Sequence, residues 1–143
     1  MATAGRNLVT AAALIFISVA ALRATTPQAT TKDGVYTAAQ AERAKDLWAK
    51  GCARCHTLGT LSTAPNDKGP SLSGDAFLTK WNGKPLFDLV DGIQKNMPND
   101  FSMELTAAQA ADATALILQV NGFPAGSKAL AAGDALKAVT IVK

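Results

Sequence analysis

Apolar residues recur at helical spacing in three stretches of the chain, which predicts helices over about residues 38–51, 85–97 and 107–121. The first and last begin with a Thr followed three residues later by a Gln, the pattern of an N-terminal capping box. The apolar faces are Ala41, Ala44, Leu47 and Trp48; Leu86, Leu89, Val90 and Ile93; and Ala113, Leu116, Ile117 and Val120. These stretches predict an all-α domain.

The segments between and after these helices are less regular. Residues 57–74 contain Gly, Ser, Pro and Asn at the density of turns, which predicts an irregular loop, and a short helix is expected around residues 75–81. The tail, residues 123–143, ends in the β-prone stretch AVTIV, for which the sequence shows no obvious partner. We expect the tail to wrap around the helical domain.

The first 24 residues have the pattern of an export signal. Arg6 precedes a run of 15 apolar or small residues, from position 8 to position 22, and alanines lie at the end of the run and just after it. Cleavage after Ala21 and cleavage after Ala24 both fit this pattern. The alternative is an uncleaved membrane anchor, although a helix that spans a bilayer usually needs about 20 residues.

The part of the chain that would remain after export is nearly neutral. Loss of residues 1–24 removes two arginines, so 14 basic residues fall to 12 against 11 acidic ones, and the net charge falls from +3 to +1. The remaining charges alternate in sign, which argues against binding to nucleic acid. Residues 25–35 contain almost nothing to bury and predict a flexible leader, so the folded domain is expected to span residues 36–143.

Both cysteines and the only histidine of the chain lie within five positions, in the run Cys52-Ala-Arg-Cys55-His56. This Cys-x-x-Cys-His run is the attachment signature of haem c, in which the two thiols form thioethers and the imidazole ligates the iron. A disulfide would close a very small loop and restrain little of the unfolded chain. A zinc site would need two more Cys or His ligands, and a thioredoxin-like pair would need a βαβ setting. A chance motif is the remaining alternative.

The stretches AERAKDLWAKGCARCHTL, GPSL, NMP and LTAAQAADATALILQVNGFP, in this order and spacing, resemble the small bacterial class I c-type cytochromes. The resemblance covers residues 36–124. It implies a cytochrome c-like fold of three to five short helices around one covalent haem, with the first and last helices crossing. Ala44 occupies the crossing position, where the family often has Gly, and Trp48 would pack against the last helix.

The resemblance also implies roles for individual residues. His56 would be the proximal iron ligand, and the Pro70 carbonyl would accept a hydrogen bond from its other ring nitrogen. Met97 would supply the sixth ligand, and Trp81 would donate a hydrogen bond to a haem propionate. Alternatively, Pro70 is a simple turn residue, Trp81 is a packing residue, and Met103 competes with Met97 for the iron.

A haem iron with both axial positions filled implies transfer of single electrons rather than binding of a substrate. We therefore expect a periplasmic electron carrier, not an enzyme, whose redox partner proteins could be a dehydrogenase and a terminal oxidase. The stretch ILQVNGFPAGSKAL also resembles cytochrome subunits of periplasmic oxidoreductases, which is the alternative function. A gas-binding haem protein and a thiol oxidoreductase are the two rival classes.

Overall fold

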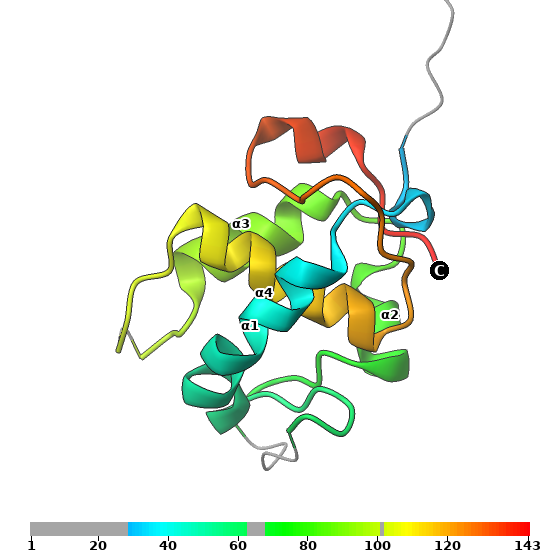
Figure 1. Ribbon diagram of the computed structural model, residues 1–143. Helices are drawn as coiled ribbons and strands as arrows, with labels where there is room; N and C mark the ends of the chain where they lie inside the picture. Colours follow the sequence, from blue (N-terminus) through cyan, green and yellow to red (C-terminus); the bar gives the residue numbers. More distant parts are fainter. Residues whose placement is uncertain (1–28, 63–67, 101) are drawn as a thin grey trace, which may run out of the picture.

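The computed structural model describes residues 29–62, 68–100 and 102–143, and the predicted export signal, residues 1–24, lies outside this part (Figure 1). Each predicted helix is present, with ends that differ from the prediction by at most one residue. Within the described part the β-structure is limited to two isolated bridges, so the prediction of an all-α, cytochrome c-like fold is confirmed. The elements are η1 (Thr31–Asp33), α1 (Ala38–Lys50), η2 (Cys52–Arg54), α2 (Gly74–Trp81), α3 (Leu86–Asn96), α4 (Ala107–Val120) and η3 (Asp134–Ala138).

Both predicted capping boxes form. At the start of α1, the Thr37 hydroxyl accepts a hydrogen bond from the Gln40 backbone, and the Gln40 side chain accepts one from the Thr37 backbone. Thr106 and Gln109 form the same reciprocal pair at the start of α4. Each box satisfies backbone N–H groups that the first helical turn would otherwise leave without a partner.

Helices α1 and α4 cross and pack against each other, as Figure 1 shows. The α1 side of this interface buries Ala41, Ala44 and Trp48, which are 0%, 2% and 3% exposed. At its edge, the Arg43 guanidinium and the Asp112 carboxylate form an ion pair at 2.9 Å. Helix α3 also packs on α4, so the three amphipathic helices share one core.

The end of the predicted flexible leader is held against the C-terminal tail. The Thr31 backbone N–H donates to the Thr140 carbonyl at 3.0 Å, and the buried Thr31 hydroxyl accepts from the Val142 N–H at 2.9 Å. The prediction of a flexible leader therefore needs correction over residues 29–35, whereas residues 25–28 lie outside the described part. Composition did not reveal this contact because backbone groups and one hydroxyl make it.

The β-prone end of the tail has a partner in the turn before α3. The Leu86 N–H donates to the Val139 carbonyl at 2.8 Å, and the Ile141 N–H donates to the Lys84 carbonyl at 2.9 Å. Ile141 is fully buried, and Leu136 on η3 is 7% exposed beside α3. The expected wrapping of the tail is therefore observed, and the tail covers one side of α3 (Figure 1).

Candidate functional site

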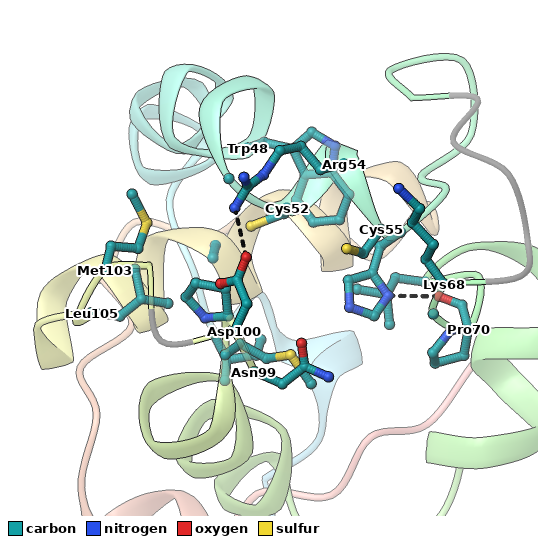
Figure 2. A pocket seen from close by; sticks show the side chains of 18 of the residues that line it. Trp48, Cys52, Arg54, Cys55, Lys68, Pro70, Asn99, Asp100, Met103 and Leu105 are labelled. Carbon is teal, nitrogen blue, oxygen red and sulfur yellow. Dashed lines mark hydrogen bonds and ion pairs between the residues drawn. The ribbon is translucent and has the colours of Figure 1, made fainter.

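The Cys-x-x-Cys-His run forms a tight turn directly after α1. The backbone N–H groups of Cys55 and His56 both donate to the Cys52 carbonyl, at 3.1 and 2.9 Å. This turn brings the two free thiols to the same side of the backbone, and Figure 2 shows both sulfur atoms pointing into one cavity. The short spacing of the motif thus serves to present two thiols and an imidazole to one space.

The His56 ring is buried and its orientation is fixed from one side. Its Nδ1 atom lies 2.8 Å from the Pro70 carbonyl oxygen, to which a protonated Nδ1 donates. A Cβ atom added at Gly69 would lie only 2.8 Å from His56 Cε1, so the backbone at residue 69 passes directly against the ring. With Nδ1 engaged, Nε2 is the nitrogen that remains for a ligand.

The cavity has a volume of about 120 Å³ and is open to solvent at its mouth. Most of its lining is apolar and comes from α1, α3, α4 and the loops between them. The Nε1 atom of Trp48 is buried here without a hydrogen-bond partner among the described residues. The apolar lining residues include Trp48, Leu72, Ile93, Met97, Leu105, Ala113 and Ile117. A concave, mostly apolar space with few polar groups is typical of a cofactor site.

Both candidate sixth ligands lie at this cavity. Met97 is half-buried directly after α3, where its N–H donates to the Ile93 carbonyl at 3.2 Å. Met103 is 37% exposed, and a Cβ atom added at Gly51 would meet its sulfur at 3.4 Å. Met103 therefore packs against the end of α1, where it covers backbone, and Met97 stays the predicted ligand.

Trp81 is not among the described residues that line the cavity. Its indole ring is half-buried at the end of α2, with the ammonium groups of Lys80 and Lys84 at 5.3 and 5.6 Å from the ring centre. Its Nε1 atom is buried without a partner in the described part of the chain. The hydrogen bond from Trp81 to a haem propionate thus stays a prediction.

A charged contact that sequence reasoning missed lies at the mouth of the cavity (Figure 2). Arg54 Nη2 donates to the Asp100 carboxylate at 3.2 Å and to the Ser102 hydroxyl at 3.0 Å. Hydrogen bonds from Ser102, together with the Arg54 charge, lower the pKa of the Asp100 carboxyl and thus favour its ionised form. Nothing in the sequence pattern pairs these residues, because Arg54 and Asp100 are 46 positions apart.

The Cys52 thiol lacks the lowered pKa that is typical of a redox-active pair. Burial raises the pKa of the Cys52 thiol, whereas reactive Cys-x-x-Cys pairs have a lowered pKa that provides a thiolate.

The described residues contain no group of three or more His, Cys, Asp or Glu side chains that could hold a metal ion. No helix in residues 29–62, 68–100 and 102–143 has the length and hydropathy needed to cross a membrane.

A family described as cytochrome c oxidase, cbb3-type, subunit III, matches residues 39–117, more than half of the chain. The chain belongs to this family of c-type cytochromes. The match begins in α1, includes the Cys-x-x-Cys-His run and ends in α4, so it covers the walls of the cavity. No curated protein and no solved structure matches the cytochrome significantly. The resemblance inferred from the motifs is therefore confirmed at the level of the family.

Membership of the family implies that the cytochrome carries covalently bound haem c. The residues at the cavity fit this group. The two thiols and the imidazole face an apolar space, and beside it lies the buried indole N–H of Trp48, which has no partner among the residues that the structure describes. This space lies between the turn that carries Cys52 and Cys55 and the end of α3 that carries Met97.

Proposed function

We propose that this cytochrome is a single-haem electron carrier whose iron is ligated by His56 and Met97. The observation that carries the proposal is the 2.8 Å contact between His56 Nδ1 and the Pro70 carbonyl, beside two thiols on a cavity that Met97 also lines. This contact leaves one imidazole nitrogen for the iron and increases its basicity. A filled sixth position favours electron transfer over substrate binding.

The haem iron supplies the chemistry, which is a one-electron change between the ferrous and ferric states. The chain provides attachment through Cys52 and Cys55, which would fix the haem plane relative to α1. Its apolar walls exclude water, and the Pro70 carbonyl holds the imidazole ring in one orientation while the iron changes charge. Met97, as a thioether ligand, favours the ferrous state and would raise the reduction potential.

Export and the choice of partners belong to the same proposal. The N-terminal 24 residues support transfer to the periplasm, where the protein would be free or attached through an uncleaved anchor. There it would carry electrons between redox partner proteins, such as a dehydrogenase and a terminal oxidase. The nearly neutral charge after export predicts little electrostatic steering, so rates of reaction with partners should depend weakly on ionic strength.

A second candidate function is that of a cytochrome subunit in a periplasmic oxidoreductase complex. The description of the matching family, subunit III of a cbb3-type oxidase, favours this candidate. The two functions differ in how long the cytochrome stays associated with its partner proteins. A subunit stays with its complex during purification from detergent-solubilised membranes, whereas a carrier is recovered alone from the periplasmic fraction.

The absorption spectrum of the protein expressed in a periplasm with haem-attachment machinery tests the proposed function. We expect a c-type difference spectrum between the reduced and oxidised forms, and a reduced Soret band that carbon monoxide does not shift. A rapid shift of the Soret band with carbon monoxide would contradict electron transfer as the function and indicate a gas-binding protein. A haem-free protein with a reducible disulfide would instead identify a thiol oxidoreductase.

A further inference from the structure

The ion pair between Arg54 and Asp100 joins the two segments that carry the proposed iron ligands. Arg54 lies two residues before His56, and Asp100 lies three residues after Met97. Both side chains line the mouth of the cavity, and Figure 2 shows the guanidinium meeting the carboxylate across it. The contact thus connects opposite ends of the site through side chains rather than through the backbone.

Little else among the described contacts holds the segment after Met97 in place. Pro98 is half-buried, whereas Asn99 and Asp100 are exposed. The Asp100 carboxylate accepts hydrogen bonds from the Ser102 N–H at 3.1 Å and from Arg54 at 3.2 Å. Because burial contributes little at Asn99 and Asp100, the hydrogen bonds from Arg54 to Asp100 and to Ser102 are the side-chain contacts, among the described residues, that join the segment to the turn before His56.

We propose that Arg54 and Asp100 are positioning residues that hold the Met97 segment in the arrangement needed for ligation, an inference that rests on the proposed function. Exchange of Met97 for an external ligand requires the segment to move away from the iron. If that movement separates Arg54 from Asp100, the ion pair opposes it. Binding of the external ligand then has to break the pair, so its apparent binding free energy is less favourable by the free energy of the pair.

The size of the effect follows from exposure of the pair. The two side chains are 53% and 52% exposed, and such ion pairs are weak because water and salt screen them. Loss of the pair should therefore increase the affinity of the ferric protein for imidazole by about three- to five-fold. A larger increase would require movement of parts beyond this contact.

The test is a titration of the ferric holoprotein with imidazole, followed through the Soret band, at low ionic strength. The variants are Arg54→Gln, Asp100→Asn and the double substitution. Asparagine keeps an oxygen that can accept from the Ser102 N–H, so Asp100→Asn removes mainly the ion pair. We expect all three variants to bind imidazole more tightly, Arg54→Gln and the double variant by about three- to five-fold. Asp100→Asn should have the smaller effect because it keeps the hydrogen bond from Arg54 to Ser102, and the double variant should bind no more tightly than Arg54→Gln.

The direction of the two single effects separates positioning from a simple effect of charge on the iron. Arg54→Gln removes a positive charge and Asp100→Asn removes a negative one, so a purely Coulombic effect would change the affinity in opposite directions. The matched control is the Arg43–Asp112 pair, which joins α1 to α4 away from the cavity at 2.9 Å. Arg43→Gln and Asp112→Asn should leave the imidazole affinity unchanged.

Opposite or additive effects of the two substitutions, or an unchanged affinity in both, would overturn the positioning role. The proposed ligation is tested separately in the same samples through the near-infrared band of a sulfur–iron bond. If that band is present in the parent protein and lost in Met97→Ala, a failure of the imidazole test concerns the positioning role alone. If the band persists in Met97→Ala, both proposals fail together.

Discussion

Replacement of Gly69 by alanine tests the contact between the backbone and the His56 ring. The added Cβ atom would lie 2.8 Å from His56 Cε1, 3.0 Å from His56 Nδ1 and 3.0 Å from the Cys55 carbonyl oxygen. Carbon atoms in good contact lie about 3.5–4.0 Å apart, so the ring or the backbone has to move. Neither the His56 ring nor the Cys55 carbonyl is the flexible end of a side chain. The ring is also held by the hydrogen bond between its Nδ1 atom and the Pro70 carbonyl oxygen, at 2.8 Å.

The expected loss of stability in Gly69→Ala comes from overpacking alone. Gly69 does not have a positive φ, so alanine is compatible with its backbone conformation. Overpacking of a well-packed site typically destabilises a protein by about 1–3 kcal/mol. We expect Gly69→Ala to lower the free energy of unfolding of the holoprotein by about that amount, measured by chemical denaturation followed through far-UV circular dichroism.

Gly92 provides a matched control with an effect of the opposite sign. It lies inside α3, and a Cβ atom added there meets no atom within 4 Å. Gly92→Ala should stabilise the protein by about 0.5–1 kcal/mol because alanine favours the helix. A Gly69→Ala protein as stable as the parent would refute the close approach between the backbone and His56.

Four further substitutions and one control test the haem attachment, the helix crossing and a buried phenol. Cys52→Ala and Cys55→Ala should each prevent two-thioether attachment, which intact mass measures; normal attachment in either would contradict the site. Ala44→Leu should destabilise the protein by about 1–3 kcal/mol through overpacking, unlike Ala49→Leu at an exposed position of α1, and equal denaturation midpoints would contradict this. Burial raises the pKa of Tyr36 above 10.0, so stability should fall as pH rises through that raised value, and less steeply in Tyr36→Phe.

Local sequence patterns predicted the helices and the central motif well. Spacing of apolar residues and the two capping boxes are properties of neighbouring positions, and both survive in the fold. The resemblance to c-type cytochromes also anticipated that Pro70 lies against His56, which the structure shows at 2.8 Å. Such features could be predicted because each depends on a few residues of the sequence or on a motif shared by the family.

Contacts between distant residues could not be predicted in the same way. Gln40 donates to the Leu130 carbonyl at 2.8 Å and accepts from its N–H at 2.7 Å, across 90 positions. Thr31 and Arg54 likewise make their contacts with residues far along the chain. Single polar residues produce no periodic pattern, and their backbone partners can have any side chain. Only the tertiary fold identifies these pairs.

The near-infrared spectrum of the ferric protein tests the central claim, ligation of the haem iron by Met97, most directly. The weak band of a sulfur–iron bond should be present in the parent protein and in Met103→Ala, because Met103 packs against the end of α1. It should be absent in Met97→Ala, whose reduced form should also bind carbon monoxide. Persistence of the band in Met97→Ala would contradict the account, and loss of the band only in Met103→Ala would assign the ligand to Met103.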